Sequence, residues 1–230
     1  MFLDSRYNNL KDDSGQPEVT ADQLQSLAAL FIRHNAQDVF GLHLVHGHFR
    51  IDEDMIMLGV GLGTGSPGYW TKPTKYANVD KDSIHGHIYV LSSENHFIAY
   101  EYREEPSADK WKQVHPSFFS ELALHLVTKD LAGVLGLQVL DRPAVSSERM
   151  LEFILGGEAT AILREQDVNH GGIYRVTGWS FGQDEDGIIS VKGNESHAKT
   201  TKGTHQVFID GKPLPTLEAV TDVLYNEGIL

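Results

Sequence analysis

The chain contains no cysteine among its 230 residues. This excludes disulfide bonds, thiolate metal ligands and cysteine nucleophiles. Any bound metal would therefore need histidine, aspartate, glutamate or water as ligands. A protein without cysteine suits the reducing cytosol, and we expect a cytoplasmic protein.

Basic residues are scarce, with 19 Lys and Arg against 32 Asp and Glu and a formal net charge of -13. Such a chain repels phosphate backbones and anionic lipid, so we expect no nucleic-acid partner and no membrane partner. No run approaches the roughly 20 apolar residues of a membrane-spanning helix. The first 13 residues lack the basic start and apolar centre of a signal peptide. A homo-oligomer is left open.

The hydrophobic fraction of 40% is sufficient for one buried core, and we predict a single domain over residues 1–230. The nearest feature to a linker is a charged, proline-containing stretch near residues 104–114, which is short enough to be a loop. Helical periodicity and capping residues predict helices at residues 21–35, 117–129 and 216–225.

Short β-like runs separated by turn residues predict several antiparallel hairpins, among them 84–91 with 96–102 and 151–155 with 158–164. Regular βαβ alternation is missing. The expected fold is therefore α+β: an antiparallel, hairpin-rich curved sheet or open barrel with flanking helices.

Two His-Gly-His triplets, His46-Gly47-His48 and His85-Gly86-His87, fall on runs predicted as strands at residues 39–51 and 84–91. Histidines two positions apart on a strand project from the same face. If the strands are neighbours, the four imidazoles can bind one divalent metal ion, with zinc, iron and copper all accepting such ligands. With 12 histidines in the chain, solvated strand faces remain an alternative.

The residues Gly41, His46, His48, Glu53 and Gly59 have a spacing that resembles the first metal motif of the cupin family. The spacing departs from that motif by one residue at each end, and no second cupin motif follows. The resemblance implies a β-barrel with a metal site of three histidines and one glutamate, and oxygenase, isomerase or related chemistry. It covers His46, His48 and Glu53, and leaves His85 or His87 as the third histidine.

Tyr89 lies near the second triplet and, with Glu53, is a candidate for moving protons. Tyrosines on a half-buried sheet are more often packing residues. His197 falls in a polar segment at residues 193–197, where a single histidine is usually solvated. No Gly-x-Ser-x-Gly sequence is present, which argues against a serine hydrolase.

We therefore predict a metal-dependent enzyme that acts on a small-molecule substrate, with oxygenase, isomerase, lyase and hydrolase chemistry left open. One alternative is a non-catalytic domain that binds a small molecule or a protein. Another is a metal-free enzyme that uses histidine as acid or base. The predicted site consists of the metal ligands His46, His48, His85 and His87 and the catalytic residues Glu53 and Tyr89.

Overall fold

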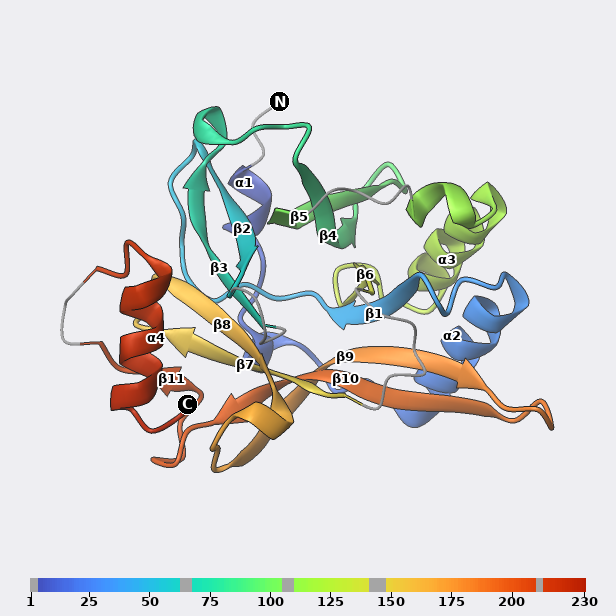
Figure 1. Ribbon diagram of the computed structural model, residues 1–230. Helices are drawn as coiled ribbons and strands as arrows, with labels where there is room; N and C mark the ends of the chain where they lie inside the picture. Colours follow the sequence, from blue (N-terminus) through green and yellow to red (C-terminus); the bar gives the residue numbers. More distant parts are fainter. Residues whose placement is uncertain (1–3, 63–67, 105–109, 141–147, 210–212) are drawn as a thin grey trace.

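The structure is a computed structural model that describes residues 4–62, 68–104, 110–140, 148–209 and 213–230 (Figure 1). Its helices are α1 Asp4–Tyr7, α2 Ala21–Arg33, α3 Pro116–Thr128 and α4 Leu217–Asn226. Its strands are β1 Phe40–Leu44, β2 Met55–Gly61, β3 Gly68–Lys75, β4 Ile84–Leu91, β5 Phe97–Glu104, β6 Leu135–Val139, β7 Met150–Leu155, β8 Ala159–Arg164, β9 Gly172–Gln183, β10 Ile189–Lys199 and β11 Gln206–Val207.

Ten of these strands form a closed β-barrel in the order β10-β9-β1-β6-β4-β5-β2-β3-β8-β7, because β10 also pairs with β7. The short strand β11 adds to the outer side of β7. The prediction of an open curved sheet or open barrel with flanking helices is therefore wrong. Closure depends on two parallel pairings, β10 with β7 and β2 with β5, whose partners are far apart in sequence. Parallel pairs have no hairpin turn to announce them, so turn residues do not predict them.

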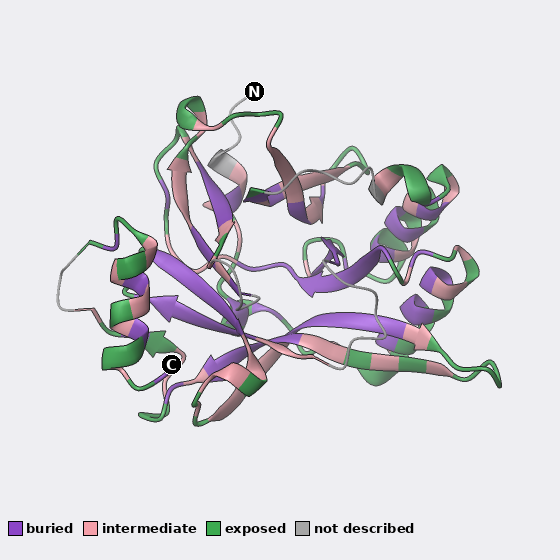
Figure 2. Ribbon diagram, in the orientation of Figure 1, coloured by how far each residue is buried: buried purple, intermediate pink, exposed green. Residues whose placement is uncertain are grey.

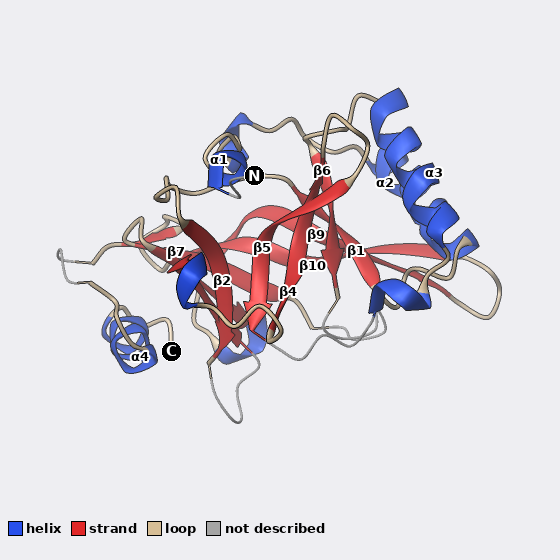
Figure 3. Ribbon diagram, turned by 90° about the horizontal axis from the view of Figure 1, so that it is seen from above, coloured by secondary structure: helices blue, strands red, loops and turns tan. Residues whose placement is uncertain are grey.

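The outward-facing side chains of the barrel form two apolar clusters under the helices. Around α2 and α3, Phe31 and Phe118 pack with Phe40 and Leu42 of β1. Around α4, Val220 and Leu224 pack with residues of β7 and β8 such as Phe153. The two groups of helices lie at opposite ends of the molecule (Figure 3), and the strands that they cover are largely buried (Figure 2).

The local predictions for the helices are confirmed. Helix α2 begins at a capping box, in which the Thr20 side chain accepts from the Gln23 backbone and the Gln23 side chain accepts from the Thr20 backbone. The hairpins β4–β5 and β7–β8 are also present where turn chemistry predicted them.

The predicted strand at residues 39–51 ends early, because β1 stops at Leu44 and the first triplet lies in the loop that follows. After Leu44, side chains from the N-terminal segment form hydrogen bonds with the backbone, in place of a neighbouring strand. Asn8 forms two hydrogen bonds with the Ile51 backbone, at 2.8 and 2.9 Å, and the Gln16 amide donates to the Val45 carbonyl. The chain therefore leaves the sheet before His46.

Strand β4 contains an irregularity at His87 that the sequence pattern did not predict. Gly86 pairs with Tyr102 and Ile88 pairs with Glu101, so two residues of β4 oppose one of β5. As a result, His87 and Tyr89 do not share a face: His87 is buried beside Arg103, while Tyr89 packs against the cluster under α2 and α3. Strand alternation alone would have placed His87 and Tyr89 on the same face of β4, and the irregularity separates them.

The prediction of a single domain over residues 1–230 stays a prediction. Residues 105–109 of the stretch considered as a junction lie outside the described residues. Across the described parts of the chain, no helix is both long enough and apolar enough to cross a membrane.

Candidate metal centre

The inner surface of the barrel carries several buried polar side chains. Strand alternation explains their position, since Leu42 and Leu44 of β1 face the helices and His43 between them faces inward. Buried charged groups are rare unless they are paired or bind metal. The inward histidines and acidic residues that are buried are His43, His46, His87, Glu101, Glu152, Glu195 and His197.

Four of the buried or half-buried groups converge on one point: His46 and His48 from the loop after β1, Glu152 from β7 and His197 from β10. One ligand atom from each lies within 4.8 Å of the others. The barrel closure creates this arrangement, because His197 and Glu152 are direct partners in the parallel pairing of β10 with β7. The cluster therefore lies at the barrel seam, by which we mean the pairing of β10 with β7 that closes the barrel.

The separations between the donor atoms are short. His46 Nε2 lies 3.1 Å from His197 Nε2, and His197 Nε2 lies 3.0 Å from Glu152 Oε2. His48 Nε2 lies 3.0 Å from Glu152 Oε1, and His46 Nε2 lies 3.9 Å from Glu152 Oε2. Two ligand atoms that are each about 2.1 Å from one ion are about 3.0 Å apart at a right angle and about 3.4 Å apart at a tetrahedral angle. These four separations lie within the range that two ligands of a single ion can have.

In His46 and His197, the ring nitrogen that points away from the cluster, Nδ1, lies beside a carbonyl or carboxylate oxygen that orients the ring. His46 Nδ1 donates to the Leu44 carbonyl at 2.6 Å, which leaves the lone pair of Nε2 directed at the cluster. His197 Nδ1 lies 3.3 Å from Asp13 Oδ2, an ion-pair distance without the alignment of a hydrogen bond. Partners of this kind behind ligating histidines are common in metal sites.

The charges of the cluster interact strongly because the side chains of all four groups are almost completely shielded from solvent. Burial alone raises the pKa of Glu152, but the charge of His48 and hydrogen bonds from the histidines outweigh it and hold that pKa well below its usual value. Burial, with help from the neighbouring histidines, lowers the pKa of His46 to about 4. For His197, burial acts to lower the pKa, yet Asp13 and Glu152 together raise it to about 10.

Without a metal, the His197 proton is the positive charge that balances Glu152 and Asp13. A single N–H at His197 Nε2 then faces both His46 Nε2 and Glu152 Oε2, at 3.1 and 3.0 Å, and can be aligned well with only one of them. A divalent ion can accept lone pairs from all of these atoms at once. Three imidazole nitrogens and one carboxylate oxygen also form a donor set that zinc, iron and copper accept. The residues present therefore fit a metal.

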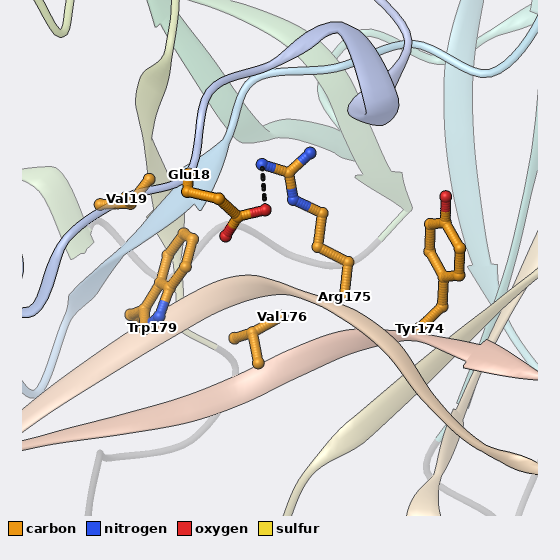
Figure 4. A pocket seen from close by; sticks show the side chains of 6 residues that line it. All are labelled: Glu18, Val19, Tyr174, Arg175, Val176 and Trp179. Carbon is orange, nitrogen blue, oxygen red and sulfur yellow. Dashed lines mark ion pairs between the residues drawn. The ribbon is translucent and has the colours of Figure 1, made fainter.

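The N-terminal segment is attached firmly beside the cluster. Arg175 of β9 donates to the backbone carbonyls of Asp13, Gln16 and Pro17, the last two at 3.1 and 2.8 Å. Figure 4 shows the Arg175 side chain reaching this segment and its ion pair with Glu18, whose nearest atoms are 3.6 Å apart. The pocket drawn there is lined by Glu18, Val19, Tyr174, Arg175, Val176 and Trp179 and contains no residue of the cluster. The anchoring instead positions Asp13 against His197.

The structure places the residues predicted from the sequence in several different surroundings. His46 and His48 belong to the cluster, whereas His85 and His87 lie on β4 and are not part of it. Glu53 is exposed in the turn before β2. Tyr89 donates to the Gly86 carbonyl at 2.9 Å and accepts from Trp111 at 3.2 Å on the other face of the sheet. Their roles as ligands or catalytic groups stay predictions.

Sequence reasoning missed Glu152 and His197, and only one of them left a clear signal. Glu152 is a lone carboxylate in the apolar run Met150–Leu155, and a charge on a buried strand needs a partner. His197 was expected in a solvated loop, but β10 continues to Lys199 and the His197 side chain is fully buried. No family model, curated protein or solved structure matches the chain.

Proposed function

We propose that the protein is a metal-dependent enzyme that acts on a small organic molecule, with His46, His48, Glu152 and His197 as the metal ligands. The observation that carries the proposal is the convergence of four donor atoms from three separate elements to within 4.8 Å of one another. A structural salt bridge would need only two of these groups.

A divalent ion at this position would polarise a carbonyl oxygen or lower the pKa of a bound water. The protein contributes the orientation of the ligands: the Leu44 carbonyl and Asp13 fix two imidazole rings, and Arg175 holds the backbone that carries Asp13. Such supporting partners typically change metal affinity or activity by about 10–100-fold when they are removed.

A group suited to proton transfer lies elsewhere in the same barrel interior. Burial, reinforced by the charge of Glu152, raises the pKa of Glu101 to about 7. Its carboxylate forms no hydrogen bond or ion pair within the described ranges, so it is available to a substrate. General acids and bases work best when their pKa is close to the operating pH. Glu101 is therefore our candidate for the acid or base, in place of the exposed Glu53.

Elemental analysis of the purified protein, before and after incubation with zinc, iron or copper, tests the proposal. We expect one metal ion per chain, and loss of that ion in His46→Ala and Glu152→Gln. His96→Ala is the matched control, because its side chain is 75% exposed and it should keep the metal. His85→Ala and His87→Ala should also keep it.

Absence of metal in the unmutated protein under all of these conditions would contradict the proposal. Metal loss in His85→Ala or His87→Ala, with retention in Glu152→Gln, would favour the four-histidine site predicted from the sequence. If no variant changes the metal content, a metal-free enzyme or a binding domain becomes the better account.

A further inference from the structure

A second group of buried polar side chains inside the barrel surrounds the guanidinium of Arg103, on β5. The Arg103 side chain is 2% exposed, and His87 is equally buried. Arg103 Nη2 donates to His87 Nε2 at 3.1 Å, and the guanidinium carbon lies 3.3 Å from the centre of the Tyr69 ring. These contacts fix the plane of the guanidinium without neutralising its charge.

No acidic side chain forms an ion pair with Arg103 in the part of the chain that the structure describes. Glu101, two residues earlier on the same strand, makes no such contact. Glu195 is near enough to influence the pKa of His87, but its carboxylate is already bonded to His43 at 3.1 Å and to Gln138 at 2.9 Å. A buried charge that lacks a counter-charge is unfavourable, which calls for an anion from outside the chain.

Three buried donor groups, one of them on the guanidinium itself, also lack partners. Arg103 Nη1, His87 Nδ1 and Thr71 Oγ1 are all buried and form no hydrogen bond. The role of His87 Nε2 as acceptor from Arg103 leaves the proton on Nδ1, so this atom is a free donor. Buried polar atoms in native proteins are normally satisfied, so unpaired donors in one region indicate a missing acceptor.

Gly59 of β2 borders the same region. A Cβ atom there would lie 3.0 Å from both Arg103 Cδ and Thr71 Oγ1 and 3.3 Å from Arg103 Nη1. Any larger residue would therefore press on the unpaired atoms. The glycine therefore avoids a close contact with Arg103 and Thr71 at this position.

We propose that Arg103 binds the carboxylate group of the substrate, with Thr71 as an additional donor and His87 holding the guanidinium in place. The planar guanidinium matches the two oxygens of a carboxylate. One cation balances one carboxylate, whereas a phosphate group would bring a second negative charge for which the described residues offer no partner. The identification of this anion as part of a substrate rests on the proposed function; the anion site itself does not.

The test measures binding of acetate, propionate and benzoate, with inorganic phosphate for comparison, to the zinc-loaded protein at constant ionic strength by calorimetry. We expect saturable binding of the monocarboxylates that is about 10-fold or more weaker in Arg103→Met, because a hydrogen bond to a charged group is lost. Arg33→Met is the matched control, since Arg33 is 61% exposed and pairs with Glu121. This control should bind as the unmutated protein does.

Equal binding to Arg103→Met would overturn the proposal, because the carboxylate would then be held by the metal or the surface. Tighter binding of phosphate than of every carboxylate would overturn the choice of anion, and an absence of saturable binding would mean that water alone satisfies the donors. If Arg103→Met does not fold, Arg103→Lys carries the test: it keeps the charge but loses the paired donors, so unchanged affinity would contradict guanidinium recognition. Metal content measured on the same samples separates this proposal from the metal centre, since either can fail while the other holds.

Discussion

The first triplet, His46-Gly47-His48, lies in a loop beside Glu152 and His197, whereas the second, His85-Gly86-His87, lies on β4 beside Arg103. Identical residues therefore meet opposite charges within one barrel. At the first triplet, carboxylates and imidazole lone pairs collect around a point that suits a cation. At the second, a guanidinium and unpaired donors collect around a point that suits an anion. The neighbours of a histidine, more than its local motif, decide what it can bind.

Replacing the central glycine of each triplet by alanine should give the largest difference in stability between the two regions. A Cβ atom at Gly86 would lie 2.5 Å from Tyr89 Cζ and 2.7 Å from Ala99 Cβ. Tyr89 cannot move aside easily, because Trp111 and the Gly86 carbonyl both hold its hydroxyl. Gly86→Ala should therefore lower the free energy of unfolding by about 3 kcal/mol, measured by urea denaturation.

Gly47→Ala is the matched variant for that comparison. The nearest atoms to a Cβ atom there are Leu10 Cβ and the Tyr7 carbonyl oxygen, both at an ordinary 3.4 Å. The free energy of unfolding should change by about 0.5 kcal/mol or less. A larger loss of stability in Gly47→Ala than in Gly86→Ala would contradict the close packing described at Gly86 and the open packing described at Gly47.

The pH dependence of binding sharpens the same comparison with a smaller effect. In the metal-free protein the pKa of His197 is raised to about 10, so its ring is protonated at neutral pH and must lose that proton to bind metal. Metal affinity should rise about tenfold, or about 1.4 kcal/mol, for each pH unit between about 7 and 9. Calorimetry in buffers with different ionisation enthalpies should detect about one released proton per metal ion.

The stability of the metal-free protein should follow the opposite sign. Because the folded-state pKa of His197 lies above the unfolded value, its contribution to the free energy of unfolding is fully present below about pH 6.5 and is lost as the pH rises towards about 10.

At the second triplet, burial and then the charge of Arg103 hold the pKa of His87 well below its usual value, so His87 stays neutral at these pH values. Carboxylate binding there should release no proton, and proton release at both sites would contradict this difference.

Local chemistry was sufficient to predict most helices and hairpins. The capping box at Thr20 and the Gly156-Gly157 turn each specify their element within a few residues. Closure of the barrel was not predictable in this way, because the pairing of Glu195 to His197 with Met150 to Glu152 joins distant segments. The irregularity at His87 was equally hidden, since it depends on which β5 residue faces each β4 residue.

Two of the four proposed metal ligands were predictable, again because local sequence patterns are visible and distant pairings are not. His46 and His48 are close in sequence, so their spacing marked them as a pair, although the strand assigned to them ends at Leu44. Glu152 and His197 join them only when the barrel closes, and no local pattern records that closure. In the proposed centre the carboxylate comes from Glu152, in the second half of the chain, and not from Glu53.

The central claim is that the barrel seam holds one metal ion. Anomalous diffraction from crystals of the protein loaded with zinc, iron or copper, collected at the absorption edge of that metal, tests it directly. The account predicts one peak at about 2.0–2.2 Å from Nε2 of His46, His48 and His197 and from a carboxylate oxygen of Glu152. A peak at His85 and His87, peaks only on the surface, or none at all would contradict it.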